Sequence, residues 1–454
     1  MILLLTQFNI KGPRMDFQNA IIEILGIQDV TIEAIHIHKK SRKLRIVAKQ
    51  NRDACFCTGC GLQFDSIKGW QKKELRVPPV GIYANVKLIL SQMRGICEVC
   101  DASEVAEAAW IHPVFKSMTC GFAEVAGRLM EETTCEAVSR ILFMKSMTLW
   151  RVDQWRMKLM EKRLVLPTNL DVSHLAADEV HHRTVVNRNR KGLFAKRHVP
   201  EFVTNLVATK AGKIIANAAG RDSVAIEECL LKLSPSQLLS VENFAVDMHE
   251  PFISVIRTEC PNAKICVDRF HLAQKVNEAF DKVRRTEFKK ARDQNDGFTE
   301  SMLEPHRRFI LMAREKDLSK TELKMLDKLR DANKDIHTAM ILVEYFHRAL
   351  DRTKILSFRK ALRAWYLVVR ESKLEPFLKF AKLVRRYRME IEAYIESGLT
   401  TAVAEGLNNK IKTLKRVAYG YSNQQSFLRK ILQRCGFLNH QYIETDDLFY
   451  AVTP

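Results

Sequence analysis

Four cysteines in two CxxC pairs constrain the fold of the N-terminal part of this chain more than any other feature. One pair is Cys57 and Cys60, and the other is Cys97 and Cys100. Two such pairs bring four thiolates together from two tight turns, and tetrahedral thiolate is the ligand set that structural zinc prefers. The sequence therefore predicts a structural Zn²⁺ site formed by these four residues.

The spacer between the pairs, residues 61–96, is longer than in a compact finger and fits a zinc ribbon with an inserted β-hairpin. Two β-type stretches within it, 74–77 and 86–90, are separated by a turn with two prolines. Cys55 is a further thiol nearby that leaves the choice of ligands open. The alternative is that these cysteines are incidental.

The charge balance favours a polyanionic partner. The 454 residues include 73 Lys and Arg and 53 Asp and Glu, a formal charge of +20, which is typical of proteins that bind nucleic acid. A membrane surface is the alternative, but no apolar run approaches the ~18 residues that cross a bilayer. The apolar start, residues 1–5, is too short for a signal sequence. We therefore expect a cytoplasmic, nucleoid-associated protein with no membrane partner, whose eleven cysteines are thiols or metal ligands.

A helical segment follows the cysteine pairs. Residues 119–132 and 135–142 have helical patterns, residues 145–147 read as a turn, and a third helix is expected to begin with Thr148 as its N-cap. This order fits a helix-turn-helix, whose last helix reads the major groove of DNA. A plain helical linker is the alternative.

Residues 172–280 are expected to form an α/β unit with the order strand, hairpin, helix, strand, helix, strand, which is that of an RNase H-like mixed sheet. Asp178 and Asp247 each follow an apolar strand. Carboxylates at adjacent strand ends suit Mg²⁺, which prefers hard oxygen ligands, and two ions ~3.5–4 Å apart serve phosphodiester chemistry. The alternative role for a strand-end Asp is to cap the following helix.

Residues 281–398 read almost entirely as helix, and the segment after them combines acid, amide and basic residues. On a helix, one face would carry Glu405, Asn408, Asn409, Lys412 and Arg416. A metal ligand followed by phosphate-binding residues would have this pattern. The alternative is a solvated stripe, which does not explain two adjacent Asn, because Asn is a poor helix former.

Several motifs occur in a fixed order along residues 16–440. They are the paired CxxC ribbon, Ala177-Asp178-Glu179, Val246-Asp247-Met248 with Pro251-Phe252, Pro261-Asn262-Ala263, Asp268-Arg269-Phe270-His271 and EGLNNKIKTLKRVAYGY at 405–421. In these motifs the sequence resembles the DDE transposases of bacterial insertion sequences, in the family written IS-L-three.

The resemblance implies a catalytic triad of Asp178, Asp247 and Glu405 that binds two Mg²⁺ (or Mn²⁺) ions. It also implies that Asp268 and His271 support the active site, although His271 could instead be a satisfied core histidine. The residues expected to contact DNA are Asn408, Asn409, Lys412, Lys415 and Arg416, together with Arg188, Arg190 and Lys191 in a basic loop.

The resulting fold class is multidomain α+β, with a zinc ribbon, a helix-turn-helix and an RNase H-like core interrupted by an all-α insertion. The expected domains are an N-terminal segment (1–50), zinc ribbon (51–105), helix-turn-helix (106–165), catalytic core (166–280), helical insertion (281–398) and the rest of the core with a C-terminal helix (399–454).

The expected function is DNA transposition. The N-terminal domains would bind double-stranded DNA at terminal inverted repeats, and the core would cleave the ends and join them to target DNA. Because two ends must be held together, a dimer or larger assembly is expected. The alternatives are a zinc-ribbon regulator with a silent RNase H-like scaffold, and a related nuclease. The sequence contains no GxxxxGK[ST] motif, which disfavours a nucleotide-driven motor, and no HExxH motif, which disfavours a zinc protease.

Overall fold

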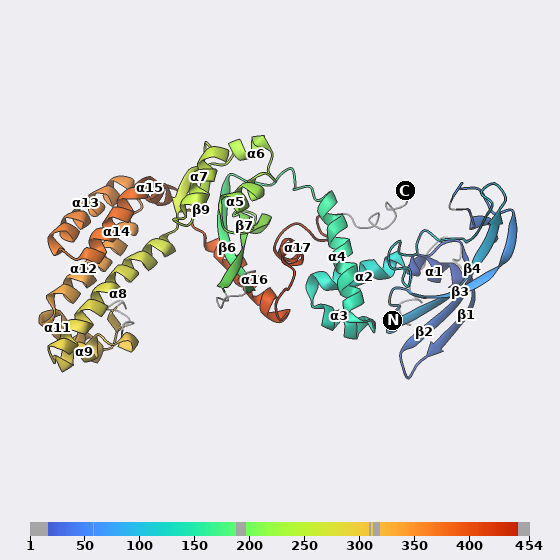
Figure 1. Ribbon diagram of the computed structural model, residues 1–454, viewed down its shortest axis with the longest axis horizontal. Helices are drawn as coiled ribbons and strands as arrows, with labels where there is room; N and C mark the ends of the chain where they lie inside the picture. Colours follow the sequence, from blue (N-terminus) through green and yellow to red (C-terminus); the bar gives the residue numbers. More distant parts are fainter. Residues whose placement is uncertain (1–16, 58, 188–196, 308–309, 312–317, 444–454) are drawn as a thin grey trace, which may run out of the picture. The chain divides into compact units, whose positions relative to one another are not determined.

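The computed structural model describes residues 17–57, 59–187, 197–307, 310–311 and 318–443 (Figure 1). The chain forms two compact units. The N-terminal unit comprises residues 1–167 and 415–454, and the central unit comprises residues 168–414. In the described ranges, no helix is long and apolar enough to cross a membrane.

The N-terminal unit begins with a five-stranded sheet of order β1-β2-β4-β3, with β5 paired to β4. Its elements are α1 (Phe17–Leu25), β1 (Val30–His38), β2 (Lys43–Gln50), η1 (Arg52–Ala54), β3 (Ser66–Arg76), β4 (Asn85–Cys97) and β5 (Ala102–Val105). The antiparallel pair β3 and β4 is the hairpin predicted between the cysteine pairs, and β4 also runs parallel to β2. One sheet therefore spans the boundary expected at residue 50.

Four helices complete this unit: α2 (Cys120–Glu132), α3 (Cys135–Leu142), α4 (Ser146–Arg163) and α17 (Gln424–Cys435). Thr119 and Thr134 cap α2 and α3 by accepting backbone N–H bonds. The predicted start of α4 was wrong by three residues, because the N-cap is Lys145 and not Thr148, and the helix begins at Ser146. The turn before it uses Phe143 in the left-handed region, with φ 51°.

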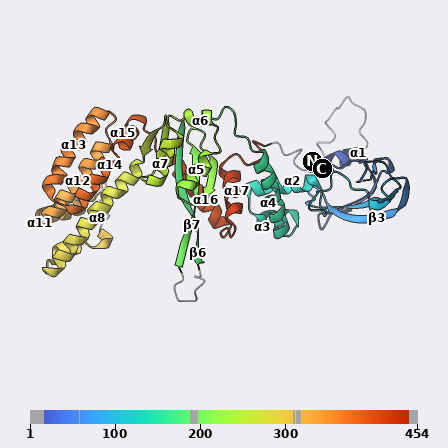
Figure 2. The ribbon, with the colours of Figure 1, turned by 45° about the horizontal axis from the view of Figure 1, so that its top comes forward.

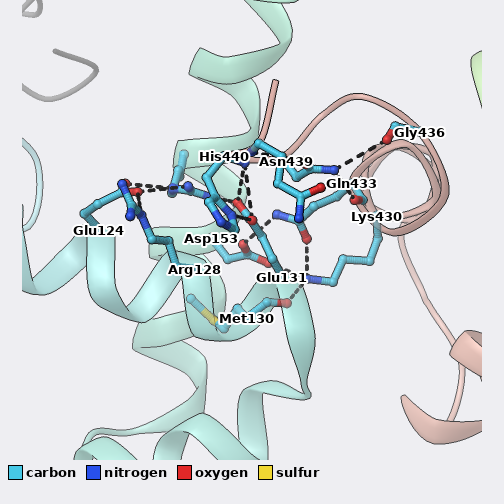
Figure 3. A network of polar contacts seen from close by, with 12 residues as sticks. Glu124, Arg128, Met130, Glu131, Asp153, Lys430, Gln433, Gly436, Asn439 and His440 are labelled. Atoms are coloured by element: carbon cyan, nitrogen blue, oxygen red, sulfur yellow. Dashed lines mark hydrogen bonds and ion pairs between the residues drawn. The ribbon is translucent and has the colours of Figure 1, made fainter. Parts of the chain in front are cut away.

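A buried polar network joins α17 to α2 and α4 (Figure 3). Lys430 Nζ lies 3.1 Å from Asp153 Oδ2 and donates to the Met130 carbonyl at 2.7 Å. Arg156 on α4 is fully buried and forms an ion pair with Glu131, which in turn accepts from His440. Buried charges are tolerated only when paired in this way. The sequence placed the C-terminal helix with the catalytic core, but its packing places it in the N-terminal unit.

His112 is a buried neutral histidine in this unit, and it gives a pH-dependent prediction. Its Nδ1 accepts the N–H groups of Val114 and Phe115, and burial lowers its pKa to about 4. Because the unfolded chain binds a proton below about pH 6.5 and the folded chain does not, stability falls as the pH drops from about 6.5 to about 4. The expected slope is at most about 1.4 kcal/mol per pH unit.

The measurement is denaturant unfolding of the wild type and His112→Asn at several pH values. An Asn oxygen can accept the same two N–H groups but does not titrate. The stability of the variant should therefore fall less than that of the wild type as the pH drops from about 6.5 to about 4. An identical pH dependence in both proteins would contradict this role of His112.

The central unit contains a second five-stranded sheet, of order β10-β9-β6-β7-β8. Its strands are β6 (His174–Asn187), β7 (Arg197–Ala208), β8 (Lys213–Ala219), β9 (Asn243–Val246) and β10 (Lys264–Val267), and its short helices are α5 (Ser223–Leu230), α6 (Pro235–Leu239) and α7 (Glu250–Glu259). Strands β6, β9 and β10 are parallel to one another. Strand β7 is antiparallel to β6, and β8 is antiparallel to β7. The hairpin of β6 and β7 extends beyond the neighbouring strands (Figure 2). The predicted element order and mixed sheet are confirmed.

A helical insertion follows β10, as the sequence predicted. It consists of α8 (Arg269–Asp293), α9 (Gly297–Met302), η2 (Pro305–Arg307), α11 (Lys320–Ala332), α12 (Lys334–Leu350), α13 (Ile355–Ser372), α14 (Glu375–Arg386) and α15 (Arg388–Ser397), before α16 (Ala402–Val417). Trp365 is fully buried there, with its ring against those of Phe346 and Phe380. The large aromatic residues thus give the insertion a core of its own.

Candidate functional site

The four cysteines of the two CxxC pairs meet in the N-terminal unit. Their sulfur atoms all lie within 4.8 Å of one another, and Cys60 Sγ is 3.5 Å from Cys97 Sγ. With Zn–S bonds of ~2.3 Å, the sulfurs of a tetrahedral site lie roughly 3.8 Å apart. The cluster is therefore compatible with a structural zinc site, as predicted.

Two glycines shape the first turn of this cluster for different reasons. Gly61 has φ +73°, which favours glycine, and its N–H donates to the Cys57 carbonyl. Gly59 leaves space, because a Cβ there would lie 3.2 Å from Cys100 Sγ. Cys55 lies outside the cluster, donates to the Asn51 carbonyl, and has its pKa raised to about 11 by burial. The geometry thus separates the four ligands from the fifth thiol.

A row of polar residues crosses the sheet of the central unit. The register of the parallel pair places Val246 opposite Val267, so the next residues, Asp247 and Asp268, are neighbours at the ends of β9 and β10. The pairing of Ala176 with Ala245, continued by two residues, places Asp178 beside Asp247. On the other side, Asp178 pairs with Asn205 of β7, which pairs with Asn217 of β8. The parallel strands β6, β9 and β10 contribute the acids, and the hairpin strands β7 and β8 contribute the amides.

Asp178 lies at the centre of this row, and both its oxygens accept hydrogen bonds. The backbone N–H of Glu179 donates to Oδ1 at 2.8 Å, and Nδ2 of Asn408 donates to Oδ2 at 2.8 Å. Burial and then the charge of Asp247 raise the pKa of Asp178 to about 7. Two carboxylates that repel each other in a half-buried site are stabilised by a cation, and oxygen ligands of this kind suit Mg²⁺.

Asp247 and His271 form an ion pair, with Oδ1 and Nε2 2.6 Å apart. This contact raises the pKa of His271, against the opposite effect of burial. The alternative of a histidine in an apolar core is therefore not what the structure shows. The neighbouring Glu179 also has its pKa raised, first by burial and then by the charge of Asp247.

Asp268 holds the start of two helices. It is 4% exposed, and its Oδ1 accepts the Phe270 N–H at the start of α8. Its Oδ2 accepts from both the N–H and the hydroxyl of Thr401, the residue before α16. The Thr401 carbonyl in turn accepts the N–H of Glu405. Asp268 therefore fixes the start of the helix that carries Glu405.

Glu405 lies on α16 between two residues that the sheet holds. Thr401 contacts Asp268 after β10, and Asn408 contacts Asp178 of β6. Seven residues of helix span roughly 10.5 Å, close to the roughly 9.6 Å across two strand spacings. The helix therefore crosses the strand ends, with Glu405 between its two contacts. In the described ranges, however, only the four cysteines come within metal-ligand spacing of one another as a group of three or more.

The residues predicted to contact DNA separate into different environments. Asn409, Lys412 and Arg416 are exposed on α16, and Lys415 is partly buried with a pKa lowered by desolvation. Asn408 is only 4% exposed, because it faces the sheet with Ala404 and Ile411. The proposed stripe is therefore split. The loop residues Arg188, Arg190 and Lys191 lie outside the described residues.

Asn205 is a site residue that sequence reasoning missed. It is 1% exposed on β7, opposite Asp178, and its Nδ2 donates to Asn408 Oδ1 at 3.2 Å. A signal existed, because a lone Asn in the apolar stretch 202–208 is a poor strand residue. Its partner on another element was not visible in the sequence.

Comparisons with known proteins agree with these features. Residues 193–431 match the sequence model of a family described as transposase, the IS-L-three group of DDE transposases. The match includes Asp247, Asp268, His271 and Glu405, and begins after Asp178. The transposase for insertion sequence element IS1001 of Bordetella parapertussis is 24% identical over 391 residues, covering 86% of this chain and 91% of that protein.

A second relative is the transposase for insertion sequence element IS1557 of Mycobacterium tuberculosis. It is 23% identical over 257 residues, which cover 51% of this chain and 56% of that protein. Because the family match alone covers more than half of the sequence, this chain belongs to the IS-L-three family of DDE transposases.

Proposed function

We propose that this transposase binds the terminal inverted repeats of an insertion sequence, cleaves each end by metal-dependent phosphodiester hydrolysis, and joins the exposed 3′-OH to target DNA. One observation carries the proposal. Asp178, within β6, and Asp247, directly after β9, lie side by side on adjacent parallel strands, and the helix that bears Glu405 is hydrogen-bonded to Asp178. DDE chemistry uses three acids, and this placement on two strands and one helix supports the proposal.

The catalytic core is proposed to be RNase H-like. The central strand β6 has an antiparallel hairpin, β7 and β8, on one side and the parallel strands β9 and β10 on the other. This order and these directions support the assignment. The helical insertion enters after β10 and the chain returns through α16, so the last acid comes from a helix and not from a strand.

Asp178, Asp247 and Glu405 would hold two Mg²⁺ (or Mn²⁺) ions. Two such ions would activate the attacking oxygen and stabilise the leaving oxygen of an in-line displacement. His271 forms an ion pair with Asp247 and would keep it in place. Asp268 positions α16 through Thr401. No protein nucleophile is needed, because positioning and charge neutralisation suffice for this reaction.

The N-terminal unit is proposed to recognise the element ends. The zinc ribbon and a helix-turn-helix formed by α3 and α4 would bind the duplex, and α4 exposes Met147, Trp150 and Arg151 to solvent. Asn409, Lys412 and Arg416 on α16 would contact phosphates. Because two ends are joined in one event, we propose a dimer or larger assembly that acts on DNA in the bacterial cytoplasm, associated with the nucleoid.

The test is a cleavage and joining assay with the purified protein. A labelled duplex carrying the DNA ends that flank its own gene is incubated with a target plasmid and Mg²⁺ or Mn²⁺. We expect nicks that leave a 3′-OH at both ends, followed by joined products. Glu405→Gln should bind the ends normally and produce neither, because Gln keeps the size of Glu but not its charge.

The alternative is a DNA-binding regulator with a silent core. Tight binding of the ends without nicking by the wild type, at all concentrations of either metal, would favour this regulator and contradict the proposal. Cleavage by Glu405→Gln at the wild-type rate would remove Glu405 from the triad while leaving the enzyme assignment intact.

A further inference from the structure

We infer that Asn408 is a positioning residue, which orients Asp178 and fixes the rotation of α16, and that Asn205 in turn orients Asn408. The inference rests on the proposed function, since Asp178 is taken as a catalytic acid. It differs from the DNA contact that the sequence suggested for Asn408, because a side chain 4% exposed and turned to the sheet has no access to a phosphate.

The hydrogen bonds of Asn408 use its whole amide. Its Nδ2 donates to Asp178 Oδ2 at 2.8 Å and approaches the Glu179 carbonyl at 3.4 Å, while its Oδ1 accepts from Asn205 Nδ2. Asp178 Oδ2 and the Glu179 carbonyl on β6 are both acceptors, so Asn408 must turn its NH₂ group toward them. Its Oδ1 then faces β7 and needs a donor there, which Asn205 supplies. The position therefore calls for Asn, and a carboxylate there would repel Asp178.

Asn205 fixes which way the amide of Asn408 points. Its own Oδ1 is buried and has no hydrogen-bond partner among the described residues. A buried polar atom without a partner costs about 1–3 kcal/mol, so apolar residues at positions 205 and 408 together would suit stability better than this amide pair. A residue that is unfavourable for stability and contacts the active site through another side chain is explained by orientation.

The same contact sets the direction of Glu405. On α16 the buried side chains are Ala404, Asn408 and Ile411, so Asn408 is the one polar group on the face that packs on the sheet. Glu405 precedes it by three residues, nearly one turn. A rotation of the helix that moved Asn408 from Asp178 would move Glu405 as well. Asn408 thus links the position of one proposed metal ligand to that of another.

The test compares three variants of the full chain with the wild type. Asn408→Leu removes the amide, and Thr413→Leu is the control at an exposed position of the same helix. In the double variant Asn205→Leu/Asn408→Leu, both partners are apolar, so no buried amide loses its partner. Four quantities are measured: thermal stability without added metal, Mn²⁺ affinity from the electron paramagnetic resonance signal of free Mn²⁺, the dissociation constant for element ends, and the single-turnover cleavage rate.

We expect Asn408→Leu to lower Mn²⁺ affinity and cleavage rate about 10- to 100-fold, the effect of losing a hydrogen bond to a metal ligand. The dissociation constant for the ends should stay unchanged. The double variant should regain the lost thermal stability but neither the Mn²⁺ affinity nor the cleavage rate. If Asn408 had only a structural role, all three would recover together. Thr413→Leu should match the wild type in all four quantities.

Other outcomes would overturn the inference in distinguishable ways. If the wild type binds Mn²⁺ and cleaves its ends but Asn408→Leu matches Thr413→Leu, the positioning role is wrong and the proposed function stands. If activity returns with stability in the double variant, Asn408 acts only through folding. If the wild type neither binds Mn²⁺ nor cleaves DNA, the proposed function fails, and the role of Asn408 fails with it.

Discussion

Asp178→Asn is expected to lower the rate of end cleavage at least about 1,000-fold, or ~4 kcal/mol of activation free energy. The side chain keeps its size but loses the charge that would be shared between two cations. Its place is central, since Asp178 adjoins Asp247 in the sheet and accepts the hydrogen bond from Asn408 on α16. The measurement is the single-turnover cleavage of a labelled duplex carrying one element end, at saturating Mg²⁺.

The fold should survive this change. Asp178 is half-buried beside another carboxylate, and its raised pKa means that its charge is unfavourable in the absence of metal. We therefore expect the metal-free variant to unfold at or above the temperature of the wild type at pH 8. Asp171→Asn is the matched control, because Asp171 is exposed in the same unit and pairs with Lys210 at 2.8 Å. Cleavage by Asp178→Asn within about threefold of the control would exclude Asp178 as a metal ligand.

The sequence predicted those features that depend on local chemistry or on the order of elements. Cys57, Cys60, Cys97 and Cys100 could be grouped because zinc requires four ligands and paired CxxC turns supply them. Asp178 and Asp247 could be paired because adjacent parallel strands bring their acids side by side, although β6 continues past Asp178 to Asn187 and does not end there as expected. Their assignment as metal ligands stays a prediction, since it depends on an ion that binds to the folded protein.

The features that could not be predicted depend on which faces of the elements meet. The stripe of Glu405, Asn408 and Arg416 was correctly placed on a helix, but helical spacing alone does not tell which edge of a stripe docks on a sheet. Asn408 turned inward because Asp178 and Asn205 offer it partners of the right polarity. In the same way, α17 follows α16 in sequence but packs with α2 and α4, where Lys430 meets Asp153.

The second large effect is expected from the loss of zinc. The ribbon around the cysteine cluster has a small core of its own, which consists of Cys55, Cys57, Phe64, Met93, Cys97 and Ala106. Two ligands, Cys57 and Cys97, are part of that core, so its packing depends on the sulfurs being held together. Metal binding in such small sites supplies about 10–16 kcal/mol in isolated fingers, which is folding free energy.

Cys97→Ser is therefore expected to lower zinc affinity by at least about 100-fold, more than the loss of an outer hydrogen bond does. Elemental analysis should find about one zinc ion per chain in the purified wild type and little zinc in the purified variant. Its affinity for element ends should fall, because the ribbon would no longer hold its DNA-binding shape. Mn²⁺ binding at Asp178 should be unchanged, since the acids belong to the central unit.

Cys55→Ser is the control, because Cys55 is buried beside the cluster but contributes no ligand. Equal zinc content in the two variants would show that Cys97 is not a ligand, and normal end binding by a zinc-free Cys97→Ser protein would remove the ribbon from DNA recognition.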